Sequence, residues 1–380
     1  MEKTVYWIEG DGIGAECWKA ARPIIDAAIA AEYGDTNRLC WKELLAGEKA
    51  VRETGSPLPE ETLTTLAGAE LAMKGPLGTP VGTGMRSLNV ALRQTLDLYA
   101  CIRPIRYFDG LETPVKHPEK VNMVIFRENT EDVYAGIEYD AQTPEAKKLI
   151  EFLVDNFGAK ISPDAAVGIK PMTAAGSKRL VRRALRYALD QKQPTLTLVH
   201  KGNIMKFTEG GFRRWGYEVA SEEFGDLTCT EKEPVEGKLV VKDRIADAMF
   251  QEALLHPDQY HIIALPNLNG DYLSDALAAQ VGGLGLAPGV NMSDKLAFFE
   301  ATHGTAPTIA GQDKANPGSL ILCGALMLDH IGWHGAADRI RNAVNAAISA
   351  KTVTCDLAGQ LEGAQTVGCT RFGEIVLGAL

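Results

Sequence analysis

Two aspartates stand four residues apart in segment 267–275, which reads Asn-Leu-Asn-Gly-Asp-Tyr-Leu-Ser-Asp. If a helix begins near Asp271, then Asp271 and Asp275 lie on one face, and their like charges repel unless a cation lies between them. Carboxylate oxygens suit Mg²⁺ or Mn²⁺, with substrate and water in the remaining positions. The spacing allows a divalent-metal site, although a solvated acidic helix start explains the same two residues.

Three further side chains could complete such a site or transfer protons. Asp247 lies in an apolar helical run at 245–248, where a buried carboxylate needs a cation or a hydrogen-bond donor. Lys201 follows the apolar segment 195–199, and a lysine at the end of a buried strand can have its pKa lowered enough to accept a proton. Tyr134 carries a phenol that could donate a proton. None of the three establishes a function by itself.

Arginines gather in three segments of a chain whose net charge is −10. They are Arg86, Arg93, Arg103, Arg106 and Arg127. Ser87 and Asn89, just before Arg93, suit a helix N-terminus, where free backbone N–H groups attract anions. Guanidinium groups bind carboxylates through paired hydrogen bonds, as lysine cannot. The cluster predicts a polycarboxylate ligand, while spacing alone leaves solvated surface arginines as an equal alternative.

The elements that would position these residues alternate between strand and helix, which favours a layered α/β fold with two or three domains in 380 residues. Apolar patterns predict strands at 4–8, 195–199 and 262–265 and helices at 15–31 and 336–350, and Ser177 is predicted to N-cap a further helix. The turn Gly10-Asp11-Gly12-Ile13-Gly14 is one residue short of the Rossmann fingerprint G-x-G-x-x-G. We therefore interpret it as a tight strand-to-helix turn.

Charge and composition exclude several classes of function. A net charge of −10 argues against nucleic acid or an anionic membrane as partner. The seven cysteines are scattered without a C-x-x-C pair, which favours free thiols over zinc sites or disulfides. No apolar run approaches the ~18 residues of a membrane span, and the first residues do not form a signal peptide. We expect a cytoplasmic protein.

Together, these segments resemble the isocitrate/isopropylmalate (β-decarboxylating) dehydrogenase family, and within it the bacterial-type homodimeric isocitrate dehydrogenases. The likeness runs through segments 8–14, 86–93, 123–129, 199–209, 267–283 and 300–311. It implies that family's α/β fold, which is not a Rossmann fold. By this resemblance, residues 1–98 and 282–380 form a large domain, residues 99–131 and 174–281 form a small domain, and residues 132–173 form a dimer clasp.

The resemblance also implies a reaction, the oxidative decarboxylation of isocitrate to 2-oxoglutarate and CO₂. Isocitrate would be bound by Ser87, Asn89, Arg93, Arg103, Arg127 and Asn203. Tyr134, Lys201 and Asp271 would transfer protons. Asp271 and Asp275 of one subunit and Asp247 of the other would hold Mg²⁺ or Mn²⁺, and Lys201 would also reach across, so the active site would exist only in a homodimer.

The cofactor site is implied by the same resemblance. It comprises Leu77, Thr79, His303, Gly304, Thr305, Ala306, Pro307, Thr308, Ile309, Asn316 and Asp356. NADP-using bacterial members have Lys-Tyr after the proline and a Tyr and an Arg four residues apart near the end, whereas this chain has Thr308-Ile309, Cys355 and Gly359. Each charge-assisted bond to phosphate contributes about 1.5–3 kcal/mol. We therefore expect a preference for NAD, with NADP as the alternative because the NAD branch usually has Asp where Thr308 stands.

Some relatives are inactivated by phosphorylation at the serine matching Ser87, which makes a regulatory kinase a further expected partner. The nearest rival functions are homoisocitrate and isopropylmalate dehydrogenase, against which Ser87-Leu88-Asn89 argues. A non-catalytic regulatory subunit would tend to lose acid/base or metal residues, and here they are all present. A 2-hydroxy-acid dehydrogenase on a Rossmann scaffold is disfavoured by the Gly10 turn.

Overall fold

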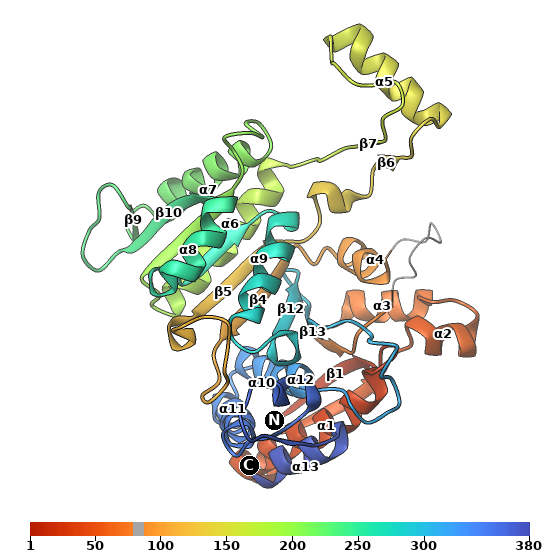
Figure 1. Cartoon of the computed structure of the whole chain (residues 1–380), viewed down its shortest axis with the longest axis vertical. Helices are drawn as coiled ribbons and strands as arrows, with labels where there is room; N and C mark the ends of the chain where they lie inside the picture. The colour runs from red at the N-terminus through yellow and green to blue at the C-terminus, as the bar shows by residue number, and fades with distance from the viewer. Residues whose placement is uncertain (79–86) are drawn as a thin grey trace.

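A continuous, mostly parallel β-sheet forms the centre of the computed structural model, which describes residues 1–78 and 87–380. Within these residues the sheet has 11 strands in the order β2-β1-β3-β13-β12-β4-β5-β11-β8-β10-β9 (Figure 1). The strands are β1 (Glu2–Ile8), β2 (Arg38–Glu43), β3 (Leu71–Lys74), β4 (Ala100–Arg106), β5 (Asn122–Glu128), β8 (Thr195–His200), β9 (Thr228–Thr230), β10 (Leu239–Ile245), β11 (Ile262–Leu265), β12 (Pro288–Met292) and β13 (Ala297–Ala301).

Strand direction divides this sheet into two parallel halves with an antiparallel centre. β2, β1, β3 and β13 run parallel to one another, as do β5, β11, β8, β10 and β9. β12 is antiparallel to both β13 and β4, and β4 is antiparallel to β5. The predicted α/β fold is confirmed.

Helices cover both faces of the sheet. They are α1 (Gly14–Tyr33), α2 (Gly47–Thr54), α3 (Glu60–Gly68), α4 (Leu88–Thr95), α6 (Ala174–Asp190), α7 (Glu209–Phe224), α8 (Ala246–Leu255), α9 (Asn267–Ala279), α10 (Gly318–His330), α11 (His334–Ser349), α12 (Cys355–Ala358) and α13 (Cys369–Gly378). α1, α10, α11 and α13 pack together beside the first half of the sheet (Figure 1). None of the helices in the described ranges has the length and apolarity needed to cross a membrane.

Strand register assigns the candidate site residues to one face of the sheet. Directly paired residues and every second residue share a face. Arg127 is the register partner of Cys101, so it shares a face with Arg103, two residues further along β4. Asn291 also pairs with Cys101, and Gly289, two residues before Asn291, pairs with Glu300, so Glu300 lies on the same face. We call the face that carries Arg103, Arg127 and Glu300 the front face and the other the back face. α9 contacts the front of β4 and β5, and α6 packs on the back.

The predicted strands and helices are confirmed with small shifts at their ends, but the predicted cap at Ser177 is wrong. α6 begins three residues earlier, at Ala174, and the Thr173 side chain caps it by accepting a hydrogen bond from the Gly176 backbone N–H at 3.0 Å. Ser177 is buried within the helix. The apolar stripe identified the helix, but the choice between two hydroxyl residues needed the backbone path.

The segment 132–173 extends away from the rest of the molecule (Figure 1). It contains η3 (Asp132–Ala135), the antiparallel pair β6 (Glu138–Tyr139) and β7 (Val167–Gly168), and α5 (Pro144–Phe157). Phe152 and Phe157 on α5 are 55% and 71% exposed. The assignment of this segment as a clasp, and the domain boundaries around it, remain predictions.

Candidate active site

Three arginines converge on the front face of the sheet. Arg103 lies on β4 and Arg127 on β5, and α4 contributes Arg93. Arg103 and Arg127 are buried, at 7% and 1% exposure. Ser87 occupies the N-cap position of α4, as its type predicted. The structure therefore brings together three of the predicted substrate residues at one end of a helix and two strands.

Carboxylates from α9 and β13 balance part of this positive charge. Arg127 forms an ion pair with Asp271 and donates from Nε to Asn267 Oδ1 at 2.9 Å. Arg103 donates to Asp275 Oδ1 at 3.0 Å and to Ser274 Oγ at 2.6 Å. Arg93 donates to Glu300 Oε1 at 2.8 Å.

Several polar atoms of this cluster have no hydrogen-bond partner within the described ranges although they are buried. They are Arg93 Nε, Arg103 Nε, Arg127 Nη2 and Asn89 Oδ1. A buried donor without an acceptor costs about 1–3 kcal/mol, more when it is charged. Burial and the positive charges of Arg93 and Arg103 lower the pKa of Arg127 below its usual range. An anion with several carboxylates would supply acceptors for the buried donors and would offset the repulsion among the three guanidinium groups. This is the strongest support for the predicted polycarboxylate site.

A buried ion pair beside this cluster was missed in the reading of the sequence. Lys74 and Glu300 are register partners on the parallel strands β3 and β13, and their charged atoms lie 2.9 Å apart. Burial alone would raise the pKa of the Glu300 carboxyl, but Lys74 and Arg93 hold it below its usual range. The available signal was a charged residue at the end of each apolar strand, Leu-Ala-Met-Lys and Ala-Phe-Phe-Glu.

Asp271 and Asp275 lie one turn apart on α9, as predicted, although that helix begins at Asn267 rather than near Asp271. Burial raises the pKa of the Asp275 carboxyl, and the like charge of Asp271 adds to this effect despite the nearby Arg103. Burial would also raise the pKa of Asp271, but Arg127 and a hydrogen bond from Tyr134 lower it. Two crowded oxygen donors fit a hard divalent cation.

The metal ligands within one chain are nevertheless incomplete. Residues 1–78 and 87–380 contain no group of three or more His, Cys, Asp or Glu side chains that could hold a metal ion. Asp271 and Asp275 would therefore require ligands from substrate, water or another chain.

Gly270 allows the Arg127 side chain to pass against α9. A Cβ atom at this position would lie 2.5 Å from Arg127 Cγ and 2.7 Å from its Cβ. We expect Gly270→Ala to displace the guanidinium and raise the KM for the polycarboxylate substrate by about 100-fold, because a displacement near 1 Å can have that effect. Steady-state kinetics would measure it, with Gly68→Ala as control because its added Cβ meets nothing within 4 Å. An unchanged KM in Gly270→Ala would argue against Arg127 as a substrate ligand.

Lys201 and Asp247 form a separate pair. The Lys201 Nζ donates to Asp247 Oδ1, and the Asp247 side chain is 70% exposed. The expectation of a buried Asp247 is wrong because the carboxylate lies on the outer side of α8, although it does meet a cation. Within the described part of the chain, no hydrogen bond or ion pair joins this pair to Asp271 or Asp275, and Asn203 is exposed. One chain alone does not assemble all the predicted residues.

Tyr134 does lie in the arginine cluster. Its hydroxyl donates to Asp271 Oδ2, and its ring lies beneath the Arg127 guanidinium, 4.9 Å from the ring centroid. Burial, together with the hydrogen bond to Asp271, raises the pKa of Tyr134 to about 12. The phenol therefore stays protonated at neutral pH and can act as a proton donor.

The predicted cofactor loop is held by the glycine turn of the first strand. Ile13 N donates to Thr305 O at 3.0 Å, and a Cβ on Gly12 would lie 2.1 Å from that oxygen. This close approach explains the glycine without a phosphate-binding role. Thr308 is exposed, whereas Ile309 packs on the core. Ala306 adopts a positive φ of 40°.

This loop meets the arginine cluster at a cavity of about 150 Å³. Leu77, Asn89, Arg93, His303 and Gly304 are among its lining residues. On the other side of the loop, Asn316 donates to Asp356 Oδ2 at 2.9 Å. The predicted residue Thr79, with Arg86, lies outside the described residues.

Comparison with known proteins identifies this arrangement. The family model described as isocitrate/isopropylmalate dehydrogenase matches residues 4–376. The chain belongs to this family. It is 38% identical to the solved isocitrate dehydrogenase from Methylococcus capsulatus, with a TM-score of 0.82 over 99% of this chain and 98% of that one. The predicted family and fold are confirmed.

Curated relatives correct the predicted cofactor. The chain is 54% identical to isocitrate dehydrogenase (NADP) from Pseudomonas aeruginosa strain UCBPP-PA14, over 98% of this chain and 92% of the relative. It is 52% identical to isocitrate dehydrogenase (NADP) 1 from Colwellia maris, with the same coverage. Because these relatives are named for NADP, the prediction of an NAD preference is wrong.

The NAD prediction took the absence of four side chains that bind the 2′-phosphate in NADP-using members as absence of any binding site for that phosphate. Other groups can supply charge in the same region, which the sequence pattern could not show. Cys355, at one of the four positions, lies 3.7 Å from the backbone oxygen of Lys314, measured from its Sγ. Lys314 is therefore one charged residue of this region, and its Nζ donates to Gln312 Oε1 at 3.0 Å.

Proposed function

We propose that this protein oxidises isocitrate with NADP⁺ and releases CO₂ and 2-oxoglutarate. The observation that carries the proposal is the set of buried, unpartnered guanidinium nitrogens beside the paired aspartates of α9. Three carboxylates on one small molecule would satisfy these donors. The family and the names of the relatives support the same reaction.

The proposed mechanism assigns the proton transfers to residues of the site. Lys201, with Asp271, accepts the proton of the C2 hydroxyl, and a bound nicotinamide would supply the hydride acceptor for C2. Mg²⁺ or Mn²⁺ bound by Asp271, Asp275 and Asp247 would polarise the C2 oxygen and stabilise the negative charge that develops on it during loss of CO₂. Tyr134 then donates its proton to the carbon that lost CO₂, which its high pKa permits.

A homodimer completes this proposal because Lys201 and Asp247 would have to come from a second chain. Exposed apolar side chains follow Lys201 in the chain, namely Ile204 (67% exposed) and Phe207 (88%), and α5 carries Phe152 (55%) and Phe157 (71%). Such residues mark association surfaces when they lie close together.

The function is tested by incubating the protein with isocitrate, Mg²⁺ and each nicotinamide cofactor and following its reduction. We expect kcat/KM to be at least about tenfold higher with NADP⁺ than with NAD⁺, because one charge-assisted bond to the 2′-phosphate suffices for that ratio. A chelator should abolish turnover. Activity on isopropylmalate or homoisocitrate without activity on isocitrate would contradict the proposal.

Ser87 is also proposed as a point of regulation by phosphorylation. It is partly exposed at the N-cap of α4, beside the arginine cluster. We expect Ser87→Asp to lower kcat/KM for isocitrate by about 100-fold, because a negative charge in a pocket for a polyanion costs several kcal/mol. Ser87→Asn, which adds bulk without charge, is the matched control. Normal turnover by Ser87→Asp would eliminate this form of regulation.

A further inference from the structure

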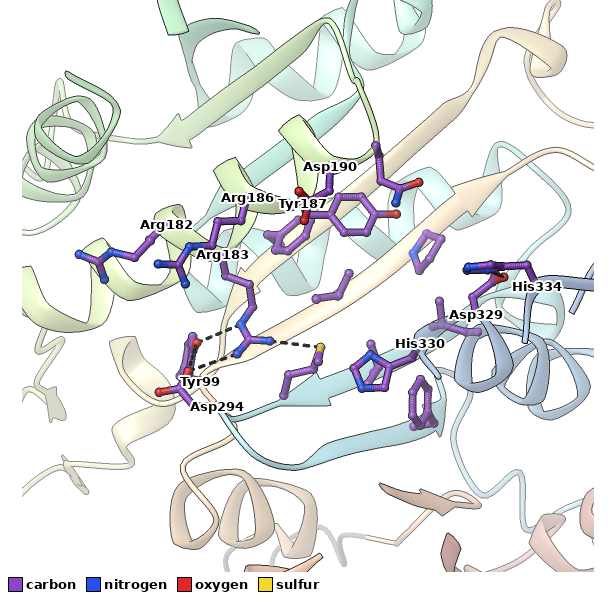
Figure 2. Close-up of a pocket in the computed structure, with 18 of the residues that line it drawn as sticks. Tyr99, Arg182, Arg183, Arg186, Tyr187, Asp190, Asp294, Asp329, His330 and His334 are labelled. Carbon is purple, nitrogen blue, oxygen red and sulfur yellow. Dashed lines mark hydrogen bonds and ion pairs between the residues drawn. The ribbon is translucent and has the colours of Figure 1, made fainter. Parts of the chain in front are cut away.

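A second, larger cavity of about 910 Å³ lies on the back face of the sheet (Figure 2). One wall is α6, and the opposite wall is formed by α10 and the start of α11. A volume of this size accommodates a small organic ligand. None of the residues proposed above for isocitrate, metal or cofactor lines it.

Its floor consists of the sequence neighbours of the active-site residues. Ile102, Phe126 and Phe299 line the cavity from β4, β5 and β13. The next residue along each strand is Arg103, Arg127 and Glu300, respectively, which point to the front face. A ligand on this floor therefore contacts the same strands that position the substrate arginines.

The α6 wall presents arginines at helical spacing, and most of them are neutralised. Arg182 forms an ion pair with Glu223. Arg183 donates to Tyr99 Oη at 2.9 Å and forms an ion pair with Asp294 Oδ1 at 3.3 Å (Figure 2). Arg186, by contrast, makes no hydrogen bond or close ion pair within residues 1–78 and 87–380, unlike its neighbours Arg182 and Arg183. No ion pair joins it to Asp190 one turn later. Glu223 interacts electrostatically with both Arg182 and Arg186, but the Arg186 guanidinium has no hydrogen-bonded partner in these ranges and is open to a ligand in the cavity.

Tyr187, next to Arg186, supplies an aromatic surface. Its ring lies over the floor, 5.3 Å from the Phe126 ring between centroids, and its hydroxyl has no hydrogen-bond partner in the described part of the chain (Figure 2). Burial raises the pKa of this phenol, so it remains a donor. The apolar side chain of Leu326 on α10 faces the same space.

We propose that this back cavity binds a planar aromatic molecule that carries a carboxylate, sulfonate or phosphate group. The ring packs against the apolar floor beside Tyr187, and the anionic group is bound by Arg186. Such a ligand is complementary to the cavity, because the Arg186 cation suits its anionic group and the apolar floor suits its ring, while the Tyr187 hydroxyl can donate a hydrogen bond. An anion without a ring would leave the floor uncovered, and a neutral ring would leave Arg186 unpaired.

Occupancy of this cavity weakens isocitrate binding. α6 packs on β5, β8 and β11, whereas α10 packs on β12 and β13, so a ligand between the two helices links the two halves of the sheet. Because the isocitrate site lies on the opposite face, bending the halves toward isocitrate separates these helices. A ligand that bridges them resists that bending, and isocitrate reciprocally weakens the ligand. This second step rests on the proposed function.

The experiment uses 8-anilinonaphthalene-1-sulfonate, a fluorescent aromatic sulfonate, with the full-length protein in the presence of Mg²⁺. We expect saturable binding of one molecule per chain. Arg186→Glu should weaken it at least about tenfold through loss of a charge-assisted bond, and Leu326→Trp should abolish it by filling the space. Arg214→Glu on α7 is the matched control because Arg214 is exposed and remote from the cavity.

In kinetic assays, the sulfonate should raise the KM for isocitrate about fivefold or more in the wild type, within the usual range of coupling between sites, and not in Arg186→Glu. Equal binding by wild type, Arg186→Glu and Leu326→Trp would overturn the site. Arg186-dependent binding with an unchanged KM would overturn the coupling. The fluorescence measurement needs no turnover, so absence of isocitrate activity would contradict the proposed function alone.

Discussion

Asp271→Asn is expected to lower kcat/KM for isocitrate by at least about 10³-fold. Asp271 contacts two other proposed site residues, because it accepts a hydrogen bond from Tyr134 and forms an ion pair with Arg127. It is also a proposed metal ligand, and a metal ion acting as Lewis acid supplies several kcal/mol to such a reaction. A loss of about 4 kcal/mol corresponds to the stated factor, at 1.36 kcal/mol per tenfold.

The measurement combines kinetics with Mg²⁺ titration in the presence of isocitrate. Asp271→Asn should bind Mg²⁺ more weakly while it keeps its circular dichroism spectrum, since the side chain keeps its shape. Asp258→Asn is the control, because this exposed carboxylate pairs with Lys120 far from the arginines. Unaltered Mg²⁺ affinity together with normal kcat/KM would remove Asp271 from the mechanism.

Lys201→Met is expected to lower kcat by about 10²–10⁴-fold, the usual contribution of a general base or acid. Among the proposed site residues that the structure describes, Lys201 Nζ contacts only Asp247. Removal of the Lys201 amine should therefore leave the arginine cluster unaltered. The KM for isocitrate should therefore change much less than kcat. Lys238→Met, which removes a partly exposed lysine just before β10, serves as control. A Lys201→Met protein with full kcat would contradict the proposed role.

The fold was predictable because its signals are local. Apolar strands such as 195–199 and the stripe of α6 follow directly from residue type and spacing. The placement of Asp271 and Asp275 on one face of a helix was predictable for the same reason. The order of these motifs along the chain then indicated the family, which the comparisons confirm.

Other features depend on contacts between distant segments and could not be predicted. The Lys74–Glu300 pair requires that β3 and β13, more than two hundred residues apart in the chain, be neighbours in the sheet. The exposed position of Asp247 depends on which side of α8 faces the sheet. The cofactor was mispredicted because the absence of family side chains at Thr308, Ile309, Cys355 and Gly359 does not show which other groups surround the ribose.

Mixing two inactive variants tests most directly whether the active site is shared between protomers. Lys201→Met and Asp271→Asn proteins would be unfolded together, refolded and assayed with isocitrate, Mg²⁺ and NADP⁺. Half of the dimers would be mixed, and each mixed dimer would contain one intact site, so activity should recover to about a quarter of the wild-type value. Each variant refolded alone should stay inactive. No recovery from the mixture, with dimers present, would contradict a site built from both chains.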